Sequence, residues 1–382
     1  MDLEELVAGL VRPTGVRSRR GSWYGNDDRL VAITAHGRGD QATGLLAQGL
    51  QHLAGRDLHL VVPRPAVDVL RARVAFLDVT VHVHPTRRTG FGDPEPPMTR
   101  TEATAFYRRL GGVTPSPRWD ATGWPGWLVE LVDWLESRRV ERVRTTEAHA
   151  WHYRGRQVLH VRQAATDGAY CLTIGAPTTD GEQTAPRRLR IAATDEPTPV
   201  EIEQMKYTVD MAIERRRTGA DAGQRERLLQ AAIGTDPALL GLTHLHREVP
   251  AWRPGQQPRC QRGSIDFLGR DVTRTGHVIE IKRGPDPQLG IQVLDYWAWT
   301  DAHRNDLAAL LDTDAHQPFE LDLVLGRTTR PLLHPAAAAT LPKLASDIAW
   351  RCHLVTHWDT IAHPGQLLTP TTEALRPRHL PA

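Results

Sequence analysis

The stretch GSIDFLGRDVTRTGHVIEIKRG, residues 263–284, decides how the last third of this chain folds. Two apolar runs, SIDFLG and HVIEIK, flank a short turn, which predicts a pair of antiparallel strands. Successive side chains of a strand point to opposite faces, so Glu280 and Lys282 share one face and Ile281 points into the core behind them. Asp266, on the partner strand, can then lie beside Glu280. The pattern predicts two carboxylates and one ammonium group at a single place.

These groups suit the hydrolysis of a phosphodiester bond. Asp266 and Glu280, helped by the backbone carbonyl of Ile281, are oxygen ligands of the kind that Mg²⁺ or Mn²⁺ takes. Such a metal polarises a phosphoryl oxygen and lowers the pKa of its bound water. Lys282 places a compact positive charge near the attacking water, where the larger fork of an arginine could not approach as closely. An ordinary cross-strand charged pair is the structural alternative.

The same residues resemble a known family. GSIDFLG, HVIEIKRG and QVLDYW are similar to the motifs of the PD-(D/E)xK nuclease superfamily, in particular to the C-terminal domain of NucS-type endonucleases and, more distantly, to RecB-type nuclease domains. Glu226 matches the upstream glutamate helix of the family, and Gln292 and Tyr296 match its QxxxY motif. Ile265 stands where the family often has proline, and the N-terminal half shows no pattern of NucS. The resemblance covers about residues 224–362.

The resemblance implies a restriction-endonuclease-like fold with a site of defined roles. Asp266, Glu280 and Ile281 would hold the metal, assisted by Glu226, and Lys282 would support the water and the transition state. The helix that carries Gln292 and Tyr296 would line the site and contact DNA or the groups around the metal.

Arginines near the motif and in a cluster before it are candidates for nucleic-acid contacts. Arg283 follows the motif lysine, and Arg215, Arg216 and Arg217 form one of several basic clusters that could grip a phosphate backbone. Each such cluster taken alone is more often a solvated face.

The rest of the chain predicts an α/β multidomain protein. Strand-like and helix-like runs alternate from Arg29 to Pro85, which indicates parallel βαβ units and a Rossmann-like α/β domain over residues 1–118. An α+β middle region with a β-hairpin and a linking helix follows at 119–218, and the nuclease-like domain takes 219–382.

Composition adds limits rather than detail. The 382 residues carry a net charge of only +2, so a surface for nucleic acid must be a local patch. Lysine occurs only at positions 206, 282 and 343, so the motif lysine stands out against an arginine background. Three widely spaced cysteines, no signal-peptide pattern and no long apolar run predict a soluble cytoplasmic protein without a membrane segment.

We therefore expect a metal-dependent deoxyribonuclease, with DNA repair or defence against foreign DNA as its setting on the strength of the resemblance. A first alternative is a ligand-gated defence effector whose N-terminal domain senses a small nucleotide activator, although no ligand motif supports one. A second is a non-catalytic nucleic-acid-binding protein. Cutting both strands would need two sites and predicts a homodimer.

Overall fold

The computed structural model describes most of the chain. The described residues are 22–34, 39–87, 90–113, 123–138, 140–144, 148–153, 156–175, 187–218, 225–255, 261–326, 333–356, 358, 361–362, 366–367 and 371–375. The short helix predicted at the very start of the chain lies outside them. No helix in these ranges is long and apolar enough to cross a membrane.

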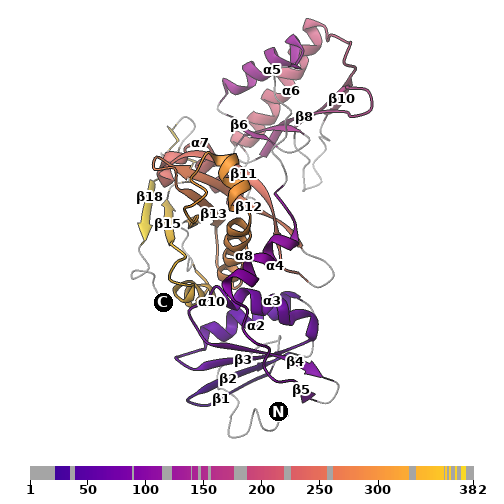
Figure 1. Ribbon diagram of the computed structural model, residues 1–382. Helices are drawn as coiled ribbons and strands as arrows, with labels where there is room; N and C mark the ends of the chain where they lie inside the picture. Colours follow the sequence, from indigo (N-terminus) through magenta and orange to yellow (C-terminus); the bar gives the residue numbers. More distant parts are fainter. Residues whose placement is uncertain are drawn as a thin grey trace. The chain divides into compact units, whose positions relative to one another are not determined.

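The chain is a mixed α/β protein that packs into two compact units (Figure 1). The first unit comprises Met1–Val113, Leu242–Leu354 and Glu373–Ala382, and the second comprises Thr114–Gly241 and Val355–Thr372. The first and last of the three predicted domains thus contribute most of a single unit, although they are far apart in sequence.

The N-terminal part of the first unit is a five-stranded sheet in chain order, β1-β2-β3-β4-β5. Its strands and helices are β1 (Ser22–Gly25), β2 (Arg29–Ile33), α2 (Gly39–Gln51), β3 (Asp57–Val62), α3 (Arg64–Val74), β4 (Val81–Arg87) and β5 (Gly90–Phe91). The three inner strands pair in parallel through α2 and α3, as the βαβ prediction requires, and antiparallel edge strands flank them. Because the order of the parallel strands never reverses, this sheet lacks the switch point at which Rossmann folds bind dinucleotides, within the described strands.

The C-terminal part of the first unit is a six-stranded sheet in the order β11-β12-β13-β14-β15-β18. Its elements are β11 (Leu242–Arg253), β12 (Gln261–Asp271), β13 (Gly276–Lys282), α8 (Leu289–Ala302), α9 (Arg304–Leu311), β14 (Glu320–Gly326), α10 (Pro335–Thr340), the 3-10 helix η4 (Leu341–Lys343), β15 (Trp350–Thr356) and β18 (Thr371–Leu375). The first three strands are antiparallel, and β13 pairs with β14 in parallel across α8 and α9. Strand β13 is buried along almost its whole length.

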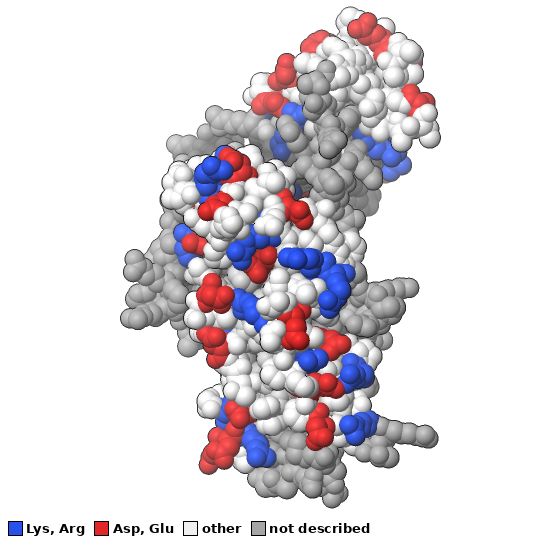
Figure 2. Space-filling view, viewed as in Figure 1, with Lys and Arg blue, Asp and Glu red and all other residues white. Residues whose placement is uncertain are grey.

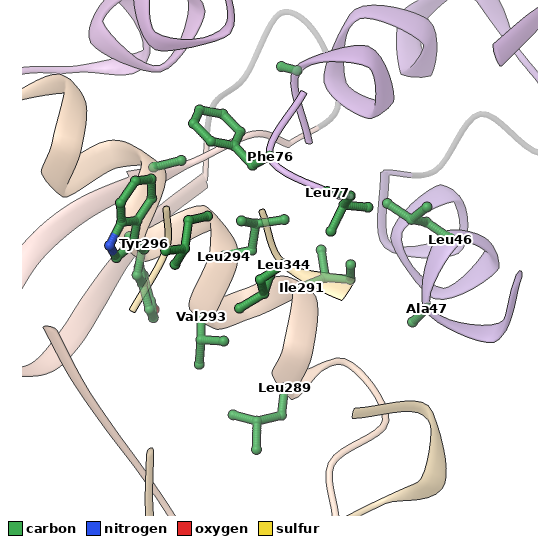
Figure 3. Packing of buried hydrophobic residues seen from close by; sticks show 14 of the residues in the cluster. Leu46, Ala47, Phe76, Leu77, Leu289, Ile291, Val293, Leu294, Tyr296 and Leu344 are labelled. Carbon is green, nitrogen blue, oxygen red and sulfur yellow. The ribbon is translucent and has the colours of Figure 1, made fainter. Parts of the chain in front are cut away.

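One hydrophobic core joins the two sheets of this unit. Helices α2 and α3, together with α4 (Arg100–Leu110), contact α8, and α2 also contacts α10. Figure 3 shows Leu46 and Ala47 of α2 and Phe76 close to the apolar face of α8, which Ile291 and Leu294 line. Helix α8 is buried on nearly all sides, so its sequence LGIQVLDYWAWTDA has no clear polar face.

The second unit has its own core. Its elements are α5 (Gly126–Glu136), β6 (Glu141–Arg144), β7 (His149–Tyr153), β8 (Arg156–Gln163), β9 (Tyr170–Ile174), β10 (Arg187–Ile191), α6 (Pro199–Thr218), α7 (Arg225–Thr235), the 3-10 helix η3 (Pro237–Leu240) and the short strands β16 (Ile361–Ala362) and β17 (Gln366–Leu367). The antiparallel sheet β10-β9-β8-β7-β6 packs its apolar face, including Trp151 and Leu159, against α5 and α6.

Three predicted elements differ from the structure. The helix predicted over WLVELVDWLESRRVERV ends at Glu136, because the following residues leave the helix and form β6, which pairs with β7. The helix predicted over residues 334–350 ends at Thr340, just before Pro342, and continues only as one 3-10 turn. The strand expected at LHREV is much longer, since β11 pairs with almost all of β12.

Candidate active site

The sheet register brings Asp266 and Glu280 next to each other, just beyond the last paired residues of β12 and β13. Strands β12 and β13 pair from Arg270 with Gly276 to Phe267 with Ile279, and Asp266 and Glu280 are the residues that follow this last pair, where a continued register would set them opposite each other. Directly opposite residues of two neighbouring strands point to the same face.

Beyond that pairing, a side chain replaces the backbone ladder. Oδ2 of Asp266 accepts a hydrogen bond from the backbone N–H of Ile281 at 2.8 Å. A buried strand N–H normally donates to a carbonyl of the neighbouring strand, so the carboxylate takes the place of that carbonyl where the two strands part. The bond fixes the Asp266 side chain beside the end of β13, while the side chain of Ile281 is fully buried on the other face.

Glu280 is a buried carboxylate held by two donors. Its side chain is 2% exposed, and Oε1 accepts from Nζ of Lys282 at 2.8 Å and from Nε2 of Gln292 at 2.6 Å. A buried charge is costly unless it is paired and hydrogen-bonded, and these two donors offset that cost. The bonds also join β13 to helix α8, on which Gln292 lies.

Tyr296 closes the site from α8. Its side chain is buried, and burial together with the nearby charge of Glu280 raises the pKa of its hydroxyl. Gly263 of β12 makes room for it, since a Cβ at that position would lie 2.8 Å from the Tyr296 hydroxyl oxygen. The guanidinium of Arg253, from β11, lies over the Tyr296 ring at 5.2 Å from its centroid.

The structure thus brings five of the expected side chains to one place: Asp266, Glu280, Lys282, Gln292 and Tyr296. Arg283 follows Lys282 at the end of β13 and is half-buried. Glu226 lies at the start of α7 in the second unit, so its part in the site stays a prediction. The cluster Arg215, Arg216 and Arg217 belongs to α6, but these side chains lie outside the described ones.

Arg253 and Gln288 are neighbours of the site that the sequence did not reveal. Arg253 was hidden because the strand that carries it was expected to end earlier, and Gln288 because it lies just before α8, outside any motif. An arginine near the end of a strand that pairs with the motif strand is the one signal that could have pointed to Arg253.

The opposite face of the same sheet holds a second polar cluster. Asp322 is fully buried and accepts from Nδ1 of His277 at 2.7 Å, Nε2 of His353 at 2.9 Å and Nε of Arg351 at 3.0 Å. These partners hold the pKa of the Asp322 carboxyl far below its ordinary value despite the burial. His277 is therefore part of the core.

In the part of the chain that the structure describes, no three His, Cys, Asp or Glu side chains gather in a metal-binding arrangement. Asp266 and Glu280 supply two carboxylates. Mg²⁺ is commonly held by one or two carboxylates with water and phosphate oxygens completing its octahedron, so the pair fits that ion.

Comparison with known proteins adds little. No family model matches the chain, and no curated protein matches it. Among solved structures, a repair endonuclease from Pyrococcus abyssi matches with 12% sequence identity and a TM-score of 0.18, covering 59% of this chain and 94% of that chain. A TM-score of 0.18 does not establish a shared fold.

Proposed function

We propose that this chain is a divalent-metal-dependent nuclease that hydrolyses phosphodiester bonds in DNA. The observation that carries the proposal is the convergence of Asp266, Glu280 and Lys282 at the end of β13, where its pairing with β12 stops. A solvated charged pair would not be buried, whereas the Glu280 side chain is 2% exposed and that of Lys282 16%.

Asp266, Glu280 and the carbonyl of Ile281 are the residues that would hold Mg²⁺ or Mn²⁺. The bound metal would polarise the phosphoryl oxygen and lower the pKa of a coordinated water. Neither Asp266 nor Glu280 can move freely, since each is fixed by a hydrogen bond to β13 or α8.

Three further residues would orient the metal ligands and stabilise the reacting phosphoryl group. Lys282 keeps an ammonium group beside Glu280, where it can stabilise the negative charge that develops on the phosphoryl group. Gln292 holds the carboxylate oxygen that it shares with Lys282, so its amide sets the direction of the Glu280 side chain. Tyr296 fills the space behind them.

The net charge of the chain is only +2. Figure 2 shows Lys and Arg interspersed with Asp and Glu over the described surface of the face in view. This distribution is consistent with a substrate held by local contacts near the site rather than by a global positive potential.

The test is cleavage of single-stranded, double-stranded, branched and mismatched DNA, beside RNA, in Mg²⁺ or Mn²⁺. We expect wild type to cut, and Asp266→Asn, Glu280→Gln and Lys282→Met each to lose about 100-fold or more in rate. Glu203→Gln and Lys206→Met, exposed or surface-paired residues of α6, are matched controls and should keep full activity.

Metal binding is measured separately, by calorimetric titration of the substrate-free protein with Mn²⁺. Asp266→Asn should weaken it, whereas Glu203→Gln should not. Absence of cleavage on every substrate, with DNA binding that Lys282→Met leaves intact, would instead identify a non-catalytic nucleic-acid-binding protein.

A further inference from the structure

A polar cavity of about 280 Å³ opens beside the carboxylate site. Four segments of the first unit line it, and six of the seven lining residues are polar or charged: Thr43, Arg73, Arg253, Gln288, Gln292 and Asp295, with Pro254 as the seventh. Gln292 belongs to both places, since its amide donates to Glu280 and its side chain also lines the cavity. Whatever occupies the cavity therefore lies next to the proposed reaction site.

The charge of the cavity comes from Arg253. Arg73 and Asp295 form a buried ion pair, with N–O distances of 2.8 and 2.7 Å, so their charges largely cancel. The remaining charge is the guanidinium of Arg253, for which no carboxylate partner is found in the described part of the chain. Its Nε is buried and has no hydrogen-bond partner among the described residues. An anion in the cavity would pair with the positive charge of this guanidinium, since Arg253 lines the cavity.

The N-terminal end of α8 also favours an anion in the cavity. Gln288 is the residue before the first turn of this 14-residue helix. The N-terminal end of a helix carries a partial positive charge and N–H groups that favour anions. Two side-chain amides, one hydroxyl and one guanidinium are hydrogen-bond donors of the kind that phosphate oxygens accept.

We propose that this cavity binds one phosphate group, with Arg253 as its main charged contact. The proposal rests on the proposed function in one respect, namely that the phosphate belongs to a nucleic-acid strand whose neighbouring phosphodiester lies at Glu280. The same chemistry could come from a free nucleotide or inorganic phosphate, and the two sources are separated experimentally.

The first measurement is the salt dependence of oligonucleotide binding by the full-length chain, carried in the Lys282→Met background without divalent metal so that no strand is cut. Loss of one phosphate contact lowers the slope of log K against log salt by about 0.7 for a single strand and about 0.9 for a duplex. We expect Arg253→Gln to show this decrease together with several-fold weaker binding at low salt. Arg274→Gln is the matched control, because Arg274 is exposed and already paired with Asp312.

The second measurement is the rise in melting temperature of the same proteins with inorganic phosphate or a nucleoside monophosphate. A rise that Arg253→Gln abolishes, with an unchanged oligonucleotide slope, identifies a free phosphate ligand. A changed slope identifies the strand backbone. If neither slope nor melting temperature depends on Arg253, the proposal is wrong.

Arg253→Lys guards against a folding artefact, since it keeps the charge and should keep the salt slope even though the stacking on Tyr296 is altered. Every one of these measurements follows binding in a protein that does not cleave. The phosphate proposal can therefore be judged even if the chain proves not to be a nuclease, and its failure would leave the nuclease proposal untouched.

Discussion

A single oxygen of Glu280 receives both a lysine ammonium and a glutamine amide. Because this oxygen is buried, bulk water cannot replace a donor that is removed. Loss of either hydrogen bond would therefore raise the free energy of the buried carboxylate. The conformation of the proposed metal ligand thus depends on a side chain of α8 that would not itself bind the metal.

Gln292→Ala should therefore reduce cleavage by about 10–100-fold and weaken Mn²⁺ binding by a similar factor, the usual effect of removing a residue that orients a metal ligand. The measurement is the rate at saturating metal beside a calorimetric Mn²⁺ titration. Gln317→Ala, in an exposed loop, serves as control. Loss of rate with unchanged metal affinity would contradict an orienting role and favour direct contact with substrate.

Gly263 offers a second test at this scale. A methyl group there would lie 2.8 Å from the Tyr296 hydroxyl oxygen and 3.1 Å from Nε of Arg253, closer than side chains tolerate. Gly263→Ala should push Tyr296 out of place and lower both activity and melting temperature. Removing the hydroxyl relieves the closest contact, so Gly263→Ala combined with Tyr296→Phe should be more active and more stable than Gly263→Ala alone. Additive losses in the double variant would show that the clash lies elsewhere.

His59 gives the N-terminal sheet an acid sensitivity. Burial, helped by the neighbouring His82 and His84, lowers the pKa of its imidazole from 6.5 to about 4. Below pH 6.5 the folded state therefore binds fewer protons than the unfolded chain. This difference leaves the free energy of unfolding unchanged above pH 6.5 and lowers it as the pH falls toward 4.

For this half-buried ring the loss amounts to about 1–2 kcal/mol after allowance for solvent screening. His59→Gln should therefore lose less stability than wild type between pH 7.5 and pH 4.5, measured by urea unfolding. His316→Gln, at an exposed position, should follow wild type. Equal losses in all three proteins would show that His59 does not couple folding to protons.

At the scale of single elements, the strands that carry the motif were the most predictable part. HVIEIK is apolar at almost every position, which suits a central buried strand, and the spacing in the motif defines the faces. The presence and length of helix α8 could be predicted from the sequence. Its position between the two sheets could not, because a helix that is apolar on all sides gives no indication of which elements pack against it.

The mistakes came from residues whose local preference was overruled by tertiary pairing. The segment ERVR is rich in good helix formers, yet it becomes β6 because the sheet of the second unit gains a strand there. The cavity beside the site escaped prediction for a related reason. Its charged members Arg73, Arg253 and Asp295 come from three elements, and no local pattern brings them together.

Helices α3 and α8 are joined by a buried ion pair. Arg73 donates to both carboxylate oxygens of Asp295 and to Oγ1 of Thr43, while the Tyr107 hydroxyl donates to Oδ1 of Asp295 at 2.7 Å. Burial raises the pKa of Tyr107 well above its ordinary value, and the charge of Asp295 adds to the effect. The pair thus links the N-terminal sheet domain to the helix that carries Gln292.

Removing one partner leaves the other charge buried. We expect Arg73→Met to cost about 3–5 kcal/mol in unfolding free energy and Asp295→Leu a similar amount, whereas the double variant should cost much less than their sum. Chemical denaturation of the four proteins completes the cycle. Additive effects would show that the pair does not act as a unit.

At the scale of the whole molecule, the sequence predicts an N-terminal domain at 1–118 and a nuclease-like domain at 219–382. Contacts gather both sheets into one compact unit, and its hydrophobic cluster includes Leu60 of β3 and Leu323 of β14. A shared core predicts shared unfolding, because opening one sheet exposes apolar surface of the other.

Leu60→Ala is the variant that tests this coupling, since Leu60 is fully buried in the N-terminal sheet. The cavity should cost about 2–5 kcal/mol. If the unit unfolds cooperatively, the slowest-exchanging amides of β13 should lose at least about 30-fold in hydrogen-exchange protection, although β13 belongs to the other sheet. Amides of β8, in the core of the second unit, should keep theirs. Loss of protection confined to β2, β3 and β4 would mean that the sheets are independent domains after all. The N-terminal sheet could then influence the carboxylate site only through local contacts such as Arg73 with Asp295, and not through the stability of the site as a whole.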